Sequence, residues 1–473
     1  MKDLLKHMSI YGLGAILSKI AQFVLLPIYT RMLQPADYGL LEMIYLNGNI
    51  FAIFFVLMIG SGFIRLYYDD ESVLYRKRLF STTFYFSLLS GIVFLSLIFI
   101  FSKSYTNLMF KGELNQKYIL YIAVAMFLSS VNMILYNRLM VRKESVKYIS
   151  LNLFTTIMTL CLAIYFLVYL KMGIRGILIS QIISFASEYI ILFILQVNSL
   201  TMSFDFFLLK NMLKYSIPLI PVQLASFVLT LSDRYFINIY QNIEDVGFYS
   251  LAYKISAIVS LLTMKPLKAF GPHILSLLKD EERCKKELSS FSSFFLFTVL
   301  SLSLLLSLFA SEIILIVSGK AFLKGASIVV LLTLSYSVIA FNNVILYGIH
   351  IVKKNYLNMI FWIVAAIINI GLNILLIPRF GIAGASSATL ISYLIITLFY
   401  FLALYRVFRI RFQYGIFVFL SILFSIFYFI GNNLEFSLII NIVLKITIVC
   451  AYLIIGMLSL YTNSVEKIHT PEV

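Results

Sequence analysis

The sequence is poor in charged residues. Asp, Glu, Lys and Arg make up 12% of the 473 residues, whereas soluble proteins carry about a quarter. Hydrophobic residues make up 61%, and the mean hydropathy is +0.98. The uncharged runs reach about 20 residues, the length of a membrane-spanning helix, rather than the alternating segments of about 10 residues that build a membrane β-barrel. We therefore expect an all-α integral membrane protein.

Cysteine and histidine are also scarce. The three cysteines share no motif spacing, and the four histidines form no HExxH motif, so we predict neither a disulfide framework nor a metal site. The chain has no GxxxxGK[ST] motif, and no loop between apolar runs exceeds about 20 residues. Because this leaves no room for a soluble catalytic or nucleotide-binding domain, we expect no cofactor, no enzymatic activity and no ATP-driven transport by this chain alone.

Apolar runs bounded by charge, Gly or Pro predict fourteen membrane spans. No small-residue cleavage site follows the first run, so we expect it to remain as the first helix rather than to be removed as a signal peptide. The spans are expected at residues 9–30, 40–62, 80–101, 118–137, 148–170, 175–197, 215–238, 248–269, 291–312, 326–349, 356–377, 382–405, 413–430 and 436–460.

The net charge of +16 follows from topology. An even number of spans puts both termini on one side of the membrane. That side collects 24 of the Lys and Arg residues outside the spans, and the other side collects 9. The positive-inside rule therefore predicts that both termini are cytoplasmic. The basic charge needs no nucleic-acid partner.

The chain repeats itself at a shift of 208 residues. "ADYGLLEMIY" (36–45) aligns with "EDVGFYSLAY" (244–253), and "KMGIRGILIS" (171–180) aligns with "RFGIAGASSA" (379–388). Six spans per repeat make the halves parallel, so we expect an N-lobe (1–205), a C-lobe (206–411) and a terminal part with spans 13 and 14 (412–473). Two such lobes facing a central cavity predict a transporter that works by alternating access.

Ionisable residues within membrane spans usually face a bundle interior or an aqueous path. Lys19 and Glu188 lie at matching depth, about 15 Å from the inner ends of spans one and six at 1.5 Å per residue. Two interpretations are open. Either Lys19 and Glu188 form a structural ion pair that holds the first lobe together, or Lys19 faces the cavity as a binding cation.

A second group lies on spans seven and eight. Asp233 and Lys254 are at equal depth on adjacent helices, so we expect them to pair, although Arg234 is an alternative partner. Whichever of Lys254 and Arg234 pairs with Asp233, the other remains as a cation for the substrate. Basic residues on facing helices would bind an anion, and a membrane-associated diphosphate fits. Arg65, at the inner end of span two, is expected to receive the anion from the cytoplasm or to serve only as a topology residue.

Other ionisable residues have weaker patterns. Glu42 and Glu312 lie near span ends, and Lys445 lies outside the repeat and is expected to be peripheral. Glu42, together with Glu188 and Asp233, is a candidate for coupling transport to an ion.

Small residues and prolines mark further positions. Gly381 and Gly384 are expected to permit close helix packing. Pro27, Pro218 and Pro221 are expected to kink or interrupt spans one and seven.

Three segments resemble a known family. They are "LLPIYTRMLQPADYGLL", "DRYFINIYQNIEDVGFYSLAYKI" and "KKNYLNMIFWIVAAIINIGLNILLIPRFGIAGASSATLISY", and the most specific pattern is N-x-x-x-N-x-x-L-I-P-x-x-G-I-x-G-A at residues 369–385. They are similar to the polysaccharide repeat-unit flippases of the O-antigen and capsule type, within the multidrug/oligosaccharidyl-lipid/polysaccharide exporter superfamily.

The resemblance implies a fold and a function. Members have two six-helix lobes in a V around a central cavity, with two C-terminal helices in fourteen-span relatives. They move an undecaprenyl-diphosphate-linked oligosaccharide from the inner to the outer leaflet of the bacterial cytoplasmic membrane, driven by an H⁺ or Na⁺ gradient or by membrane potential. Cavity cations hold the diphosphate, and Lys19 and Lys254 fall on helices where relatives carry such cations. A polysaccharide polymerase and other assembly proteins are expected partners, besides membrane lipids.

Two other functions remain open. A cation-coupled multidrug exporter of the same superfamily would use buried carboxylates such as Glu188 and Asp233, although the nearby cations oppose this. A membrane polymerase or glycosyltransferase would need a large outer loop with catalytic groups, and the outer loops here are at most about 16 residues and carry no acidic or histidine cluster.

Overall fold

The computed structural model describes residues 23–110, 115–277, 280–352, 354–433 and 437–469. Throughout these residues the secondary structure is helical and contains no strand, which confirms the expected fold class. The chain divides into two compact units, Met1–Leu224 and Ala225–Val473. We call them unit 1 and unit 2.

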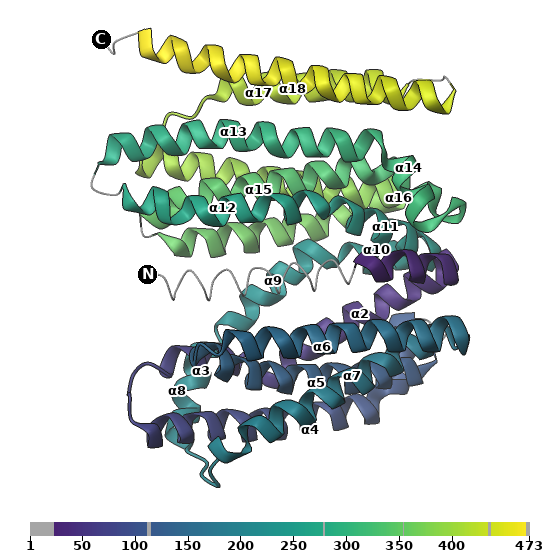
Figure 1. The fold of residues 1–473 in the computed structure, drawn as a ribbon, viewed down its shortest axis with the longest axis vertical. Helices are drawn as coiled ribbons and strands as arrows, with labels where there is room; N and C mark the ends of the chain where they lie inside the picture. Colours follow the sequence, from purple (N-terminus) through teal and green to yellow (C-terminus); the bar gives the residue numbers. More distant parts are fainter. Residues whose placement is uncertain (1–22, 111–114, 278–279, 353, 434–436, 470–473) are drawn as a thin grey trace. The chain divides into compact units, whose positions relative to one another are not determined.

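Unit 1 is built around α5 (Gln116–Val141), which packs against most other helices of the unit (Figure 1). Its core is formed by apolar side chains of these helices, with Phe55, Phe63 and Ile134 fully buried. The other helices of the unit are α2 (Pro35–Val56), α3 (Ile59–Leu66), α4 (Val73–Phe110), α6 (Ser145–Ile164), α7 (Gly173–Gln196) and α8 (Phe206–Ser216), with the short turns η1 (Tyr165–Tyr169) and η2 (Val197–Ser199). The next helix, α9 (Leu219–Leu231), crosses the boundary between the units.

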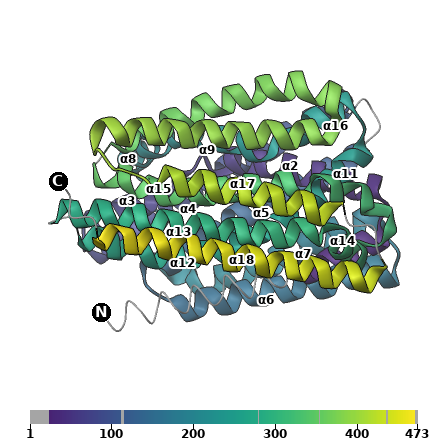
Figure 2. The same ribbon diagram turned by 90° about the horizontal axis from the view of Figure 1, so that it is seen from above.

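Unit 2 is built in the same way around α15 (Val329–Ile351), which packs against α11, α12, α13 and α16. The last two helices lie side by side along α13 (Figure 2). The helices of this unit are α10 (Asp233–Tyr240), α11 (Ile243–Ser256), α12 (Ile258–Ser276), α13 (Glu281–Leu308), α14 (Ala310–Ser318), α16 (Asn355–Val407), α17 (Tyr414–Asn432) and α18 (Leu438–His469), and the turn η3 (Lys320–Ile328) precedes α15.

Several helices begin where the sequence provides a capping residue. Asn115 Oδ1 accepts the Lys117 N–H at the start of α5, and Asn242 Oδ1 accepts the Asp245 N–H at the start of α11. Pro35 opens α2, a position where its missing N–H costs nothing. These caps lie at span ends, where the first backbone N–H groups have no partner within the helix.

Helix α16 is a hairpin of two antiparallel arms. Its 53 residues would extend about 80 Å as one rod, far more than a bilayer core of about 30 Å. Instead, Gly381 adopts a left-handed φ of 56° at the corner between the arms. The ring of Phe361 on the first arm packs against that of Phe399 on the second, with 5.3 Å between the ring centres. A Cβ at Gly384 would lie 2.4 Å from the Leu376 carbonyl oxygen, so the expected close packing at Gly384 is confirmed.

The repeat reappears in the helices. α2 begins at Pro35 and α11 begins at Ile243, 208 residues later. Gly173, which precedes Gly381 by the same 208 residues, has a φ of 58° at the corresponding corner between α6 and α7. A glycine at the equivalent position of the repeat therefore turns the chain in each half.

Twelve helices of the described residues are long and apolar enough to cross a membrane. The eleventh and twelfth predicted spans are counted together in Tyr356–Arg406, the α16 hairpin, and the first predicted span lies largely outside the described residues. The seventh predicted span is interrupted near Pro218 and Pro221, as expected, and broken again at Ser232 between α9 and α10.

Candidate functional site

Asp233 lies at the break between α9 and α10. It is the first residue of α10 and is fully buried, with 0% of its surface exposed. A buried carboxylate must be hydrogen-bonded or neutralised, because removing an ion from water costs several kcal/mol. Its partners therefore indicate what the site does.

Three uncharged side chains hold the Asp233 carboxylate. Oδ2 accepts hydrogen bonds from the Tyr249 hydroxyl at 2.6 Å and the Thr389 hydroxyl at 2.7 Å, and Oδ1 accepts one from Asn373 Nδ2 at 2.8 Å. Tyr249 belongs to α11, whereas Asn373 and Thr389 come from the two arms of α16. One carboxylate thus connects α10, α11 and both arms of the hairpin.

Two carboxamides extend this cluster. Asn373 also donates to Asn369 Oδ1 at 3.1 Å. Asn373 Oδ1 and Asn369 Nδ2 are buried and have no hydrogen-bond partner among the described residues. An acceptor oxygen without a donor, beside a buried carboxylate, offers a ligand to a small cation. We call Asp233, Tyr249, Asn369, Asn373 and Thr389 the Asp233 cluster.

The expected pair of Asp233 and Lys254 is wrong. Both residues lie in unit 2, but the Asp233 carboxylate accepts its hydrogen bonds from the uncharged donors, and Lys254 is partly buried on α11. The sequence showed only that the two residues lie at the same depth in the membrane. Contact also requires that each helix is rotated so that the two side chains face each other.

Arg234, the neighbour of Asp233, is also enclosed and only 2% exposed. Its Nε donates to the Ser250 hydroxyl at 3.0 Å, and its guanidinium carbon lies 4.4 Å from the centre of the Tyr253 ring and 5.4 Å from that of Tyr249. The guanidinium is thus positioned by a hydroxyl and by aromatic faces of α11.

Glu188, on α7 of unit 1, is 4% exposed and accepts hydrogen bonds from three uncharged side chains, described below. Glu42 is likewise buried, on α2. Lys19, the expected partner of Glu188, lies outside the described residues, so the two interpretations of Lys19 stay open.

Other charged candidates lie elsewhere. Arg65 forms an exposed ion pair with Asp69 at 2.8 Å, four residues along the chain. Lys445 of α18 pairs with Glu312 of α14 at 2.5 Å within unit 2, although the sequence indicated no partner for it. This pair connects the C-terminal helix to the unit and lies apart from the Asp233 cluster.

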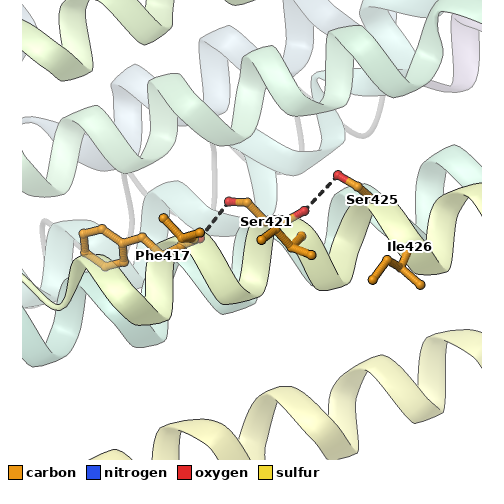
Figure 3. A pocket seen from close by; sticks show the side chains of 6 residues that line it. Phe417, Ser421, Ser425 and Ile426 are labelled. Carbon is orange, nitrogen blue, oxygen red and sulfur yellow. Dashed lines mark hydrogen bonds between the residues drawn. The ribbon is translucent and has the colours of Figure 1, made fainter.

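A shallow pocket of about 430 Å³ lies on α17 (Figure 3). Its hydroxyl groups bond to their own helix: Ser421 donates to the Phe417 carbonyl at 2.8 Å and Ser425 donates to that of Ser421 at 2.9 Å. Val418 and Ile422 line it as well. With its polar groups satisfied, this pocket is an apolar surface and offers no ligand for an ion.

Sequence reasoning found the carboxylates but missed their donors. Tyr249, Asn373 and Thr389 lie 16, 140 and 156 residues from Asp233. One signal was available, because Asn369 and Asn373 are the two asparagines of the N-x-x-x-N pattern and fall on one helix face.

Comparisons with known proteins agree with this architecture. Residues 4–278 match the family described as "Polysaccharide biosynthesis protein". A search of curated protein sequences found no match. Three solved structures share the fold, as follows.

The lipid II flippase MurJ in an inward closed conformation has a TM-score of 0.74 at 17% identity, over 95% of this chain and 99% of that chain. An inward-facing multidrug resistance MATE family transporter of the MOP superfamily has a TM-score of 0.66 at 13% identity, over 83% of this chain and 94% of that chain. A mutant of the Vibrio cholerae MATE transporter VcmN has a TM-score of 0.53 at 14% identity, over 83% of this chain and 98% of that chain. The chain therefore belongs to the polysaccharide biosynthesis protein family and is a multi-pass membrane protein with the all-α fold of MurJ and the MATE transporters.

Proposed function

We propose that the chain is a flippase that moves an undecaprenyl-diphosphate-linked oligosaccharide repeat unit from the inner to the outer leaflet of the bacterial cytoplasmic membrane. Family membership supports a place in polysaccharide assembly, and the fold shared with a lipid flippase supports alternating access. A polysaccharide polymerase and other assembly proteins are the partners that this role requires.

The family match is the observation that carries the proposed function, and the Asp233 cluster is the coupling site in this proposal. A proton or a sodium ion at Asp233 compensates a buried negative charge. Release of that cation leaves a buried charge that its hydrogen bonds and the neighbouring Arg234 must stabilise, at a cost of several kcal/mol without them. Because the carboxylate joins α10, α11 and both arms of α16, cation occupancy is linked to the arrangement of these segments.

Cations supply the substrate contacts in this proposal. Lys19, Lys254 and Arg65 are the candidates for the diphosphate, which a lysine binds as a point charge and an arginine binds with two parallel hydrogen bonds. Arg234 is enclosed by Ser250 and two tyrosines, so it reaches a substrate only in a conformation in which α10 and α11 separate.

Thermal unfolding of the purified protein tests the coupling site. The melting temperature of the wild type should rise with Na⁺ relative to K⁺, or with falling pH. A ligand at a hundredfold excess over its Kd stabilises the folded state by about 2.7 kcal/mol. Asp233→Asn and Thr389→Val should lose a Na⁺ response and reduce a pH response. Ser392→Ala is the matched control, because Ser392 is buried on α16 and bonds only to the Ala388 carbonyl of its own helix. An unchanged response in Asp233→Asn would refute the assignment.

A cation-coupled multidrug exporter is the second candidate, favoured by the likeness to a multidrug transporter structure. A deletion strain separates the two candidates. Loss of surface polysaccharide with unchanged drug susceptibility supports the flippase, and the reverse supports the exporter. Complementation with Lys19→Ala, Arg234→Ala or Lys254→Ala tests the cations, and full activity of all three at normal protein level would eliminate the cationic site.

A further inference from the structure

Glu188 is enclosed by three helices of unit 1. Its Oε1 accepts hydrogen bonds from the Tyr136 hydroxyl at 2.5 Å and the Thr155 hydroxyl at 2.7 Å, and its Oε2 accepts one from Asn132 Nδ2 at 2.9 Å. Asn132 and Tyr136 lie on α5, one turn apart, and Thr155 lies on α6. We call Glu188 and these three residues the Glu188 cluster.

The Glu188 cluster has the same three types of donor residue as the Asp233 cluster. In each, one tyrosine, one threonine and one asparagine bind a buried carboxylate. The internal repeat does not explain this match, since a shift of 208 places Ile396 opposite Glu188 and Leu25 opposite Asp233. The two units therefore hold a carboxylate with the same types of donor at positions that the repeat does not relate.

No described residue neutralises Glu188. Its partners are uncharged, and the titratable side chains that face it are Tyr136 from α5 and Tyr148 from α6. Arg138 binds Gln196 and Ser199 instead, about 12 Å further along α7 at 1.5 Å per residue. A buried carboxylate in this setting is stabilised by hydrogen bonds alone, and one bound proton would remove its charge.

Asn132 provides for the protonated state as well. Its Oδ1 is buried and has no hydrogen-bond partner among the described residues. In the arrangement seen, Asn132 Nδ2 donates both to Glu188 Oε2 and to the Phe185 carbonyl oxygen at 3.0 Å. Rotation of the carboxamide would give up the bond to Phe185 and turn Oδ1 to Glu188, where it can accept a hydrogen bond from a carboxylic acid. The Asn132 side chain can therefore hydrogen-bond to either protonation state of Glu188.

We propose that Glu188 is a second proton-binding site, separate from the Asp233 cluster, that takes up and releases a proton during transport. The proposed ligand is a proton, because one proton removes the buried charge and Asn132 Oδ1 can accept the hydrogen bond of the acid that forms. Only the link to transport rests on the proposed function. Proton binding itself does not.

Infrared difference spectroscopy across a pH titration of the purified full-length protein tests the site. The wild type should show a carboxylic acid C=O band that appears as pH falls. Glu188→Gln should lose this band, whereas Asp233→Asn should retain it. Tyr136→Phe should shift the band to higher wavenumber, because it removes a donor to Oε1. A band that is unchanged in Glu188→Gln refutes the proposal.

Two further variants keep the test decisive. If Glu188→Gln does not fold, Glu188→Asp retains a titrating acid and must change the frequency of the same band. If Lys19 pairs with Glu188, the band is absent in the wild type and appears only in Lys19→Ala, which also refutes the proposal. The spectra need no substrate, so a failed cation response at Asp233 leaves this outcome independent.

Discussion

At the scale of single residues, the Asp233 carboxylate and the Arg234 guanidinium both contact neutral groups. Asp233 accepts hydrogen bonds from hydroxyls and a carboxamide, and Arg234 binds the Ser250 hydroxyl and the face of Tyr253. A direct ion pair would hold the Asp233 charge more tightly. Neutral partners leave the Asp233 carboxylate available to a mobile cation. The planar Arg234 guanidinium is held in place by its contacts with Ser250 and Tyr253.

Arg234→Lys tests whether the guanidinium shape matters. The lysine keeps the charge but loses the Nε hydrogen bond to Ser250 and the planar contact with Tyr253, so we expect a loss of about 1.5–3 kcal/mol, the range for a hydrogen bond to a charged group. The melting temperature measures it. Arg65→Lys is the control, since that exposed pair with Asp69 is worth at most about 1 kcal/mol. Equal losses in both variants would contradict the assigned role.

The sequence alone identified the important carboxylates but not their partners. Charge within an apolar run is visible in one dimension, and this is why Asp233 and Glu188 stood out. Their donors are ordinary polar residues on distant helices, such as Thr389, 156 residues away. Depth matching paired Asp233 with Lys254 because it has no information on helix rotation, and the structure gave different partners.

At the scale of helices, the hairpin is the unit that builds the Asp233 cluster. Asn373 and Thr389 reach one carboxylate only because α16 folds back at Gly381. The sequence predicted both arms, since each is an apolar run of span length. It did not predict that the arms converge on α10, because the packing of side chains determines that contact.

Gly384→Ala should destabilise this hairpin. The new Cβ would lie 2.4 Å from the Leu376 carbonyl oxygen of the opposite arm, and backbone cannot move as a side chain can. Overpacking of this kind costs about 1–3 kcal/mol. Gly371→Ala is the matched control on the first arm: nothing lies within 4 Å of its added Cβ, so it should be neutral or stabilising by up to about 1 kcal/mol. Thermal unfolding compares the two, and equal stability would contradict the close approach.

At the scale of the whole molecule, the repeat links sequence to structure most directly. The shift of 208 residues read from short matches also relates α2 to α11 and the corner at Gly173 to that at Gly381. The buried carboxylates do not follow this symmetry. The repeated scaffold therefore carries ionisable groups at different positions in each half, which is why the scaffold was predictable from internal matches and the clusters were not.

Orientation in the membrane is predicted from the distribution of Lys and Arg between the loops on the two sides. The positive-inside rule places Lys147, in the first turn of α6, in the cytoplasm and Lys117, at the start of α5, outside, with α5 between them. Both side chains are exposed. In a variant without Cys161, Cys284 and Cys450, a membrane-impermeant maleimide should label Lys117→Cys in intact spheroplasts and Lys147→Cys only after permeabilisation. The reverse pattern would contradict the predicted orientation and place both termini outside.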